Sequence, residues 1–235
     1  MLTIIIPAAG KGSRFKEAGY TQSKPFIKAR GVPMIQRVAA MFSSVPDSRI
    51  LAIVNEEDTT SFKFLTGELK GIAISNHQKG AALSVLCANG NLADDAEVVV
   101  VNCDNLLDCD MNAFIEEARR SEAFGSMITM KVTDGPWSYV RVWGKKIYDV
   151  QEKIQISNMA TCGVYYFKSW DLLRSCIMQE VTAGLVTNGE FYLAPCYLFM
   201  LSAGSLVTSY QIPYDQFHSL GTPEDLQRYN DEQIN

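Results

Sequence analysis

Short apolar runs alternate with amphipathic stretches along the first half of the chain. The runs have the length and the β-branched content of buried strands. They lie at residues 2–6, 50–54, 72–75 and 98–101. Helical spacing is found at residues 33–42, 80–88 and 111–120. Pro33 suits a first helical turn, and Asp110 suits a helix cap. The alternation of strands and helices in this half predicts a parallel, doubly wound α/β sheet.

The pattern changes after residue 125. Strand-like runs now follow one another closely and are separated by short turns, at residues 126–132, 139–142, 146–150 and 159–167. Such spacing is typical of antiparallel or mixed additions to a sheet. Helical spacing returns at residues 169–179, 192–201 and 223–231. With no internal repeat and no linker, the pattern predicts one domain over residues 1–235.

Composition narrows the class of protein. Of 235 residues, 47% are hydrophobic and 20% are charged, which is typical of a globular protein. The net charge of −5 provides no general footprint for nucleic acid. The apolar amino-terminal run is too short for a signal peptide or a membrane span, and the six cysteines lack the spacing of a disulfide framework. We therefore expect a cytoplasmic enzyme without a membrane partner.

The most informative segment is a loop of small residues, Pro-Ala-Ala-Gly-Lys-Gly-Ser-Arg-Phe, directly after the first strand. Small side chains let main-chain N–H groups face an anion, and Gly10 and Gly12 can adopt the positive φ that such a loop needs. Arg14 could grip phosphate oxygens. The loop lacks the third glycine of a dinucleotide fingerprint and the ending of a P-loop. By itself it is equally compatible with a tight strand-to-helix turn.

Two charged residues elsewhere favour phosphate chemistry. Lys24 precedes Pro25, which should hold the lysine in extended geometry and let it face the loop. Asp104 follows the run at residues 98–101, at the end of a strand where open α/β sheets bind ligands. Asp104 is therefore a candidate Mg²⁺ ligand. Taken singly, a surface lysine and a turn-capping aspartate are the commoner roles, but their order along the chain favours a phosphate site.

These segments together resemble the sugar-phosphate nucleotidylyltransferase superfamily. Residues 8–14 match its signature loop, residues 23–25 its Pro-Lys-Pro segment with Ser23 for the first proline, residues 102–105 its metal aspartate, and residues 221–226 its carboxyl-terminal motif. The resemblance implies a Rossmann-like three-layer fold of the GT-A-like type, with a mixed, mainly parallel central sheet. The sequences of residues 12–15, 18–21 and 24–27 most resemble those of capsule-type and phosphocholine-type cytidylyltransferases, one group of which activates phosphoglutamine with CTP. No residue distinguishes CTP from UTP or dTTP.

The resemblance also implies an activity and a set of site residues. The enzyme would transfer a nucleoside monophosphate from a nucleoside triphosphate, favoured as CTP, to a phosphorylated small molecule, with Mg²⁺ as cofactor and Arg14 and Lys24 as catalytic residues. The implied nucleotide-binding residues, in a half that covers residues 1–125, are Ala8, Ala9, Gly10, Gly12, Ser13, Gly80 and Ala81. The implied acceptor-binding residues, in residues 126–235, are Glu152, Lys153, Gly163 and Glu190. Such products are precursors of capsule or cell-surface polysaccharide.

An acceptor that is a phosphate monoester is already anionic, so the reaction needs charge neutralisation and alignment and no general base. This fits a chain without a Ser/His/Asp arrangement. One departure stands out, because Ser219 replaces the second metal carboxylate of the family. Asp215 or His218 could substitute for it. Ile154 also replaces a proline that the family has after the Glu-Lys pair.

Other interpretations stay open. A glycosyltransferase of the same architecture could hold an NDP-sugar and its metal at Asp104, and the Ser219 departure fits a non-catalytic nucleotide-binding module. Glu152 and Lys153 could form an exposed ion pair. Glu190 could serve as a first-turn carboxylate of a helix that begins near residue 192. The apolar run at residues 197–201 is expected to be a buried helix or the face of a homodimer.

Overall fold

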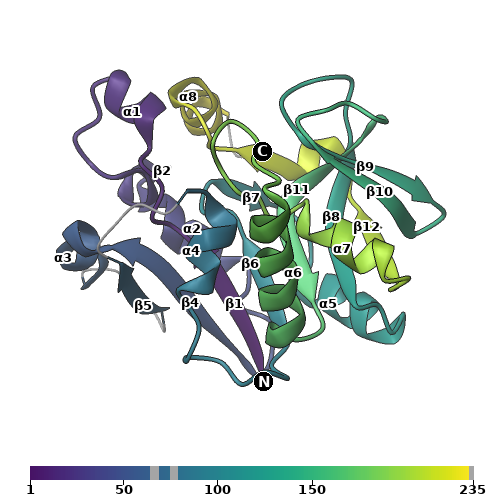
Figure 1. Cartoon of the computed structure of the whole chain (residues 1–235). Coiled ribbons are helices and arrows are strands. Elements are labelled where there is room, and N and C mark those ends of the chain that lie inside the picture. Colours follow the sequence, from purple (N-terminus) through teal and green to yellow (C-terminus); the bar gives the residue numbers. More distant parts are fainter. Residues whose placement is uncertain (64–68, 75–78, 233–235) are drawn as a thin grey trace.

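A computed structural model describes residues 1–63, 69–74 and 79–232. Within them a nine-stranded sheet has the order β5-β4-β1-β6-β11-β8-β12-β10-β9 (Figure 1). Its strands are β1 (Leu2–Pro7), β4 (Ser48–Asn55), β5 (Leu69–Ile74), β6 (Val98–Val101), β8 (Gly125–Lys131), β9 (Ser138–Trp143), β10 (Lys146–Glu152), β11 (Met159–Phe167) and β12 (Val207–Gln211). Two small ladders join β2 (Lys28–Ala29) to β3 (Val32–Pro33) and β7 (Asn105–Leu107) to β13 (Phe217–Ser219).

The sheet is mixed, as the resemblance implies. β5, β4, β1 and β6 are parallel to one another, which confirms the doubly wound arrangement expected for the first half. β11 then runs antiparallel to both β6 and β8. Beyond β6 the one parallel pair in the described sheet is β8 with β12. Short connections explain the change, because a tight turn such as the one between β9 and β10 can join only antiparallel strands.

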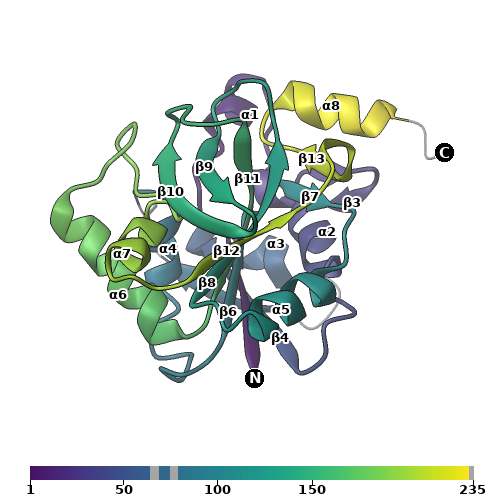
Figure 2. The same ribbon diagram turned by 90° about the vertical axis from the view of Figure 1, so that its right-hand side faces the viewer.

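Helices cover both faces of the sheet and make three layers (Figures 1 and 2). They are α1 (Ser13–Glu17), α2 (Met34–Ala40), α3 (Thr59–Lys63), α4 (Ala81–Leu86), α5 (Met111–Arg120), α6 (Trp170–Ala183), α7 (Cys196–Ser202) and α8 (Pro223–Asp231). Side chains alternate along β1, so Ile4 and Ile6 join a core with α2 and α5. Ile5 enters a second core with α4, α6 and α7. Both faces of the central strands are therefore buried.

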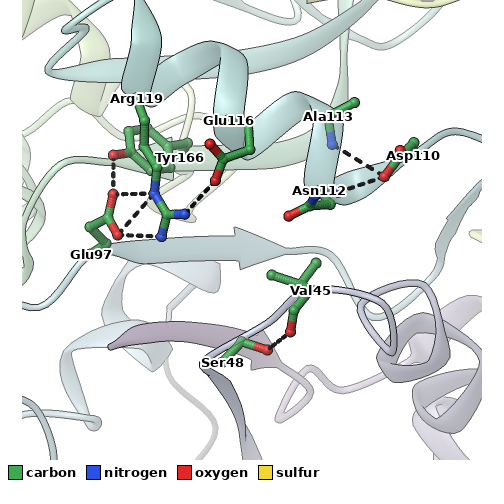
Figure 3. A network of polar contacts seen from close by, with 9 residues as sticks. All are labelled: Val45, Ser48, Glu97, Asp110, Asn112, Ala113, Glu116, Arg119 and Tyr166. Carbon is green, nitrogen blue, oxygen red and sulfur yellow. Dashed lines mark hydrogen bonds and ion pairs between the residues drawn. The ribbon is translucent and has the colours of Figure 1, made fainter.

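Several predicted elements are confirmed with their bounds, among them α5, α8 and β11. Asp110 caps α5, since its carboxylate accepts the N–H groups of Asn112 (2.9 Å) and Ala113 (3.2 Å) (Figure 3). The predicted strand at residues 72–75 corresponds to β5, with residue 75 outside the described part. The short elements β7, β12, β13 and α1 were not predicted. None of the described helices has the length and apolar character needed to cross a membrane.

A polar network ties the layers together at the amino end of β6. The Glu97 carboxylate accepts hydrogen bonds from the Arg119 guanidinium (2.6 Å at its shortest) and from the Tyr166 hydroxyl (2.7 Å) (Figure 3). Arg119 also donates to Glu116 at 2.7 Å. Burial opposes ionisation of Glu97, but the bonds from Arg119 and Tyr166 outweigh it and lower the pKa of the carboxyl. The network therefore fixes α5 and β11 to the start of β6.

One predicted helix begins later than expected. The helix predicted from residue 192 begins at Cys196, just after Pro195. Upstream of it, the Phe191 and Tyr192 N–H groups are bonded to Lys79 and Glu180, so they cannot follow a helical pattern. In α7 itself, Tyr197 and Met200 are buried in the second core, which confirms a buried helix for this apolar run.

Candidate active site

A cavity of about 960 Å³ opens at the carboxyl ends of the central strands. Both halves of the chain line it, and half of the predicted site residues lie on its wall. These wall residues are Arg14, Ala81, Asp104, Glu152, Lys153, Gly163 and Glu190. Open α/β sheets bind ligands at this edge, and a volume of this size suits a nucleotide-sized ligand.

The loop after β1 turns at one glycine. Gly12 has a φ of 60° immediately before α1, and a Cβ there would lie 3.1 Å from the Cβ of Lys24. Gly10 does not adopt a positive φ and has no atom within 4 Å of a Cβ position, so of the two glycines that permit this conformation only Gly12 uses it. Gly12, in the left-handed conformation, is the residue at which the loop turns into α1.

The other loop residues lie around this turn. Ala8 and Ala9 are buried, and the Ala8 N–H donates to Ile53 O at 2.8 Å, so this amide extends the contact between β1 and β4. Gly10 and Ser13 are exposed. Arg14 is exposed on α1 and reaches the cavity wall. The Ala8 N–H is therefore not available to an anion.

Lys24 and Asp104 meet at the edge of the cavity. The Lys24 ammonium donates to the Asp104 carboxylate and lies 3.5 Å from Gly221 O. Burial would lower the pKa of Lys24, but the Asp104 charge outweighs it and raises the pKa, so the lysine stays cationic. Lys24 opens a short 3₁₀ helix and is not extended as expected, because the turn bond from Phe26 N–H to Ser23 O (2.9 Å) overrides the effect of the following proline.

The bulge in β11 explains why residue 163 is a glycine. Gly163 has a φ of 75° at a register shift, and a Cβ there would lie 2.3 Å from the Asn105 amide nitrogen. Its carbonyl accepts the Asn102 N–H at 2.9 Å, and the Asn105 side chain donates to Cys162 O at 3.0 Å. Gly163 therefore fixes the turn that carries Asp104 into the cavity.

Ser219 lies beside Asp104. A Cβ on Gly221 would be 3.3 Å from the Ser219 hydroxyl and 3.5 Å from an Asp104 carboxylate oxygen, so both oxygens lie close to Gly221. The Ser219 hydroxyl donates to Asp225 at 3.3 Å. His218 lies 2.8 Å from Asp108. In the described part of the chain, no three His, Cys, Asp or Glu side chains gather closely enough to hold a metal ion.

This oxygen-rich corner still fits Mg²⁺. Magnesium prefers oxygen ligands and is commonly bound by one or two carboxylates together with phosphates and water. Asp104 provides such a carboxylate on the cavity wall, which Ser219 also lines with a neutral hydroxyl. The residues present therefore suit a metal ion that enters with a phosphate ligand better than one held by the protein alone.

The cavity is also lined by Glu152 and Lys153. Glu152 is 8% exposed and accepts a hydrogen bond from Ser138, and burial raises its pKa. Lys153 has a φ of 57°, and its ammonium donates to the Tyr192 hydroxyl at 2.5 Å and lies 4.4 Å from the centre of that ring. The interpretation of the pair as an exposed ion pair was therefore wrong, because the Glu152 side chain faces inward to Ser138.

Glu190 and Tyr192 come from the segment between α6 and α7. The Tyr192 hydroxyl donates to Glu190 at 3.2 Å, so Lys153, Tyr192 and Glu190 form a chain of polar contacts. Because α7 begins only at Cys196, Glu190 is not a first-turn carboxylate of that helix. Tyr192 was missed as a site residue, although its position two residues after Glu190 could have indicated it.

Gly80 brings the same segment to the nucleotide side. It has a φ of 106°, and a Cβ there would lie 2.2 Å from Phe191 O. The Phe191 N–H donates to Lys79 O at 2.8 Å, and the Ala82 N–H donates to Phe191 O at 3.3 Å. Glycine at position 80 thus lets the segment that carries Glu190 and Tyr192 lie directly against residues 79–82.

The arrangement is shared with a known family. Residues 4–160, well over half of the chain, match the MobA-like NTP transferase domain. The chain belongs to this family. The matched range includes the loop after β1 and the Lys24 and Asp104 pair, and it ends within β11. The resemblance to nucleotidylyltransferases is therefore confirmed at the level of the family.

Curated relatives in this superfamily are longer proteins. The chain is 26% identical over 234 residues to the bifunctional protein GlmU of Caldicellulosiruptor saccharolyticus, covering 93% of this chain and 48% of that protein. It is 27% identical over 201 residues to GlmU of Oenococcus oeni, covering 81% of this chain and 44% of that protein. The chain thus spans about half the length of these two relatives.

Solved structures show the same fold. The nucleoside-diphosphate-sugar pyrophosphorylase of Vibrio cholerae superposes with a TM-score of 0.80 at 22% identity, covering 99% of this chain and 100% of the other. A putative glucose-1-phosphate thymidylyltransferase of Bacillus anthracis gives 0.81 at 19% identity, covering 100% and 98%. The inositol-1-phosphate CTP transferase of T. maritima gives 0.76 at 15% identity, covering 99% and 97%. The α/β fold of this family member is thereby confirmed.

Proposed function

We propose that the protein is a nucleotidyltransferase that moves a nucleoside monophosphate from a nucleoside triphosphate to a phosphorylated small molecule and releases pyrophosphate. One observation carries the proposal. A single cavity is lined by Arg14, by Asp104, which is paired with Lys24, and by the Lys153, Tyr192 and Glu190 chain. Membership of an NTP transferase family supports the choice of donor.

The chemistry requires alignment and charge neutralisation. The acceptor phosphate is an anion near neutral pH and attacks the α-phosphorus directly, so no side chain has to remove a proton. Arg14 and Lys24 would neutralise the departing pyrophosphate, and Lys24 can do so because it stays cationic despite its burial. Lys153 would meet the acceptor phosphate. Holding the two phosphates in line provides much of the acceleration in such reactions.

Mg²⁺ would complete the charge balance. When bound, it would stabilise negative charge that develops on the phosphates. Asp104 would hold it, with phosphate oxygens and water as the remaining ligands. The main-chain N–H groups after Ala8, in the loop that runs to Ser13, would contact the nucleotide phosphates, and Gly80 and Ala81 would lie beside the nucleoside.

CTP is the proposed donor, and the proposed products are precursors of capsule or cell-surface polysaccharide. This proposal is supported by the amino-acid sequence of residues 12–15 and 24–27, which most resembles that of cytidylyltransferases. One structure with the same fold is an inositol-1-phosphate CTP transferase. On the acceptor side, Glu152 and Glu190 offer carboxylates to hydroxyl or ammonium groups of the molecule that bears the phosphate.

The decisive experiment incubates the purified protein with Mg²⁺, each nucleoside triphosphate in turn and a panel of phosphorylated sugars, amino alcohols and amides, and measures pyrophosphate. We expect release with one nucleotide and one acceptor class, and its loss in Asp104→Asn. Turnover of an NDP-sugar would indicate a glycosyltransferase in its place. Tight nucleotide binding without pyrophosphate release from any pair would indicate a non-catalytic module.

A further inference from the structure

A buried carboxyl outside the cavity contacts the segment that joins the two sides of the site. Glu180, on α6, is 0% exposed and lies where α6 and α7 pack together in the second core. Its carboxyl oxygens accept the Tyr192 N–H (3.2 Å) and the Cys196 thiol (3.3 Å). In the described part of the chain, no Lys, Arg or His forms an ion pair with it.

Stability alone gives no reason for a carboxyl at this position. A buried carboxyl without a cation is costly, and an apolar side chain of similar volume would pack there at lower cost. What the carboxyl adds is a directional bond to one main-chain N–H, at Tyr192. That N–H lies outside any helix or strand, so no backbone carbonyl of a ladder competes for it.

Tyr192 stands between two fixed points of the same segment. One residue earlier, Phe191 is held by main-chain bonds to Lys79 and Ala82 on the nucleotide side. The Tyr192 side chain contacts Lys153 and Glu190 on the acceptor side. The bond from Glu180 therefore fixes the point at which the segment passes from one substrate side to the other.

We propose that Glu180 is a positioning residue, whose buried carboxyl holds the main chain at Tyr192 and so sets the place of the Lys153, Tyr192 and Glu190 chain relative to residues 79–82. The effect on the acceptor rests on the proposed function. The effect on the segment does not. Because Phe191 keeps its own two bonds, loss of the Glu180 contact releases the acceptor side and leaves the nucleotide side in place.

The environment of Glu180 makes this contact sensitive to pH. Burial raises the pKa of Glu180 to about 7. The titratable groups that face it are Cys196 of α7, Glu152 of β10 and Tyr192 of the segment, while neither α4 nor β11 carries a charged residue. The ionised carboxylate is the stronger acceptor of an N–H bond, so the segment is held more firmly above this pKa than below it.

Hydrogen exchange tests the contact without any substrate. In the wild type, we expect amide protection of residues 187–195 to fall by about tenfold between pH of roughly 8 and 6, as a charge-assisted hydrogen bond is weakened. In Glu180→Gln, protection should be low and independent of pH over this range. Glu97→Gln is the matched control, because it alters a hydrogen-bonded glutamate at the other end of the sheet and should leave the segment unchanged.

Kinetics test the consequence for the acceptor. With the acceptor that the screen identifies, Glu180→Gln should raise its KM by about fivefold to tenfold and change kcat and the KM of the nucleotide by less than about twofold. A general loss of stability would instead alter all three together. Unchanged protection in Glu180→Gln, or an equal loss in Glu97→Gln, overturns the proposal. If no acceptor reacts, the protection pattern alone decides about Glu180, and the proposed function fails separately.

Discussion

Charged side chains at the two ends of the central sheet have different surroundings. At the amino end of β6, the Glu97 carboxylate bonds to Arg119 and Tyr166, and Arg119 is shared with Glu116 (Figure 3). At the carboxyl ends, the Lys24 and Asp104 pair borders a cavity that also contains Glu152. Charges at the first end are satisfied within the protein, whereas those at the second still have room for a ligand.

The backbone at the cavity also contains unusual conformations. Lys153 and Gly163, which line the cavity, have positive φ, as do several residues elsewhere in the described part of the chain, among them Asp47 and Glu122. A non-glycine residue such as Lys153 costs roughly 1 kcal/mol or more in this region. Such strain persists when the rest of the fold is stable enough to impose it. The comparison therefore predicts that substitutions at the amino end change stability, and that those at the cavity change activity.

The largest effect is expected for Asp104→Asn. The variant should lose turnover by a factor of about 10² or more, because a charge contact that acts in the transition state is removed. Its free energy of unfolding should change by about 1 kcal/mol or less, since the Lys24 contact borders the cavity and is partly exposed. Pyrophosphate release and chemical denaturation measure the two quantities. Asp108→Asn, at an exposed carboxylate, is the matched control and should change neither.

Arg14→Ala should produce a similar loss of turnover, about 10² or more, with no loss of stability, because the exposed guanidinium acts only on the ligand. The same pyrophosphate assay measures it. Turnover at the wild-type rate would remove Arg14 from the mechanism while leaving the role of Asp104 intact.

Gly80→Ala tests whether a packing change at the cavity end lowers both stability and activity. The new Cβ would lie 2.2 Å from Phe191 O at a φ of 106°, so the segment has to move. We expect a loss of about 2–3 kcal/mol in unfolding free energy together with a loss of activity. Gly90→Ala has a φ of 82° and open space around it, so it isolates the conformational cost. Equal destabilisation in the two variants would show that the contact with Phe191 is unimportant.

Much of the site could be predicted because it follows a topological rule. Lys24 and Asp104 are 80 residues apart in sequence. Lys24 comes after β1 and α1, and Asp104 comes after β6, and the carboxyl ends of these two parallel strands lie at the same edge of the sheet. Local signals were similarly reliable. Asp110 caps α5 and Pro223 begins α8, as their sequence context predicts.

The parts that were missed depend on contacts between distant segments. β12 has polar residues at buried positions, because Ser209 pairs with Thr129 (2.6 Å) and Thr208 with Ser126 (3.0 Å) on the neighbouring strand. No hydrophobic pattern can reveal such a strand. The role of Gly80 likewise depends on Phe191, and that of Glu180 on Tyr192.

Arg119→Ala is the corresponding test at the amino end. Removing the guanidinium leaves Glu97 without its cation, so we expect a loss of about 1–2 kcal/mol in unfolding free energy, as for other partly exposed charged hydrogen bonds. Turnover should stay at the wild-type rate, because Glu97 precedes β6, whereas the cavity is lined by residues that follow its carboxyl end, such as Asp104. Arg141→Ala, at a more exposed ion pair, should cost less. A large loss of turnover in folded Arg119→Ala would break the division between the two ends.

The smallest effect expected is a difference in pH dependence between two glutamates. The pKa of Glu97 is lowered, so its contribution is present above the ordinary glutamate pKa and is lost as the pH falls through its own pKa. The pKa of Glu180 is raised to about 7 because an ionised carboxylate is costly inside the core, so the free energy of unfolding falls as the pH rises from the ordinary glutamate pKa toward 7, even though the ionised form holds the Tyr192 N–H more firmly. Between pH of about 5 and 7, Glu180→Gln should therefore gain stability relative to the wild type, on the order of 1 kcal/mol. Chemical denaturation at a series of pH values measures this. Glu97→Gln should lose relative stability as the pH rises from about 3 to 5, and parallel curves for both variants would show that the two carboxyls share one environment.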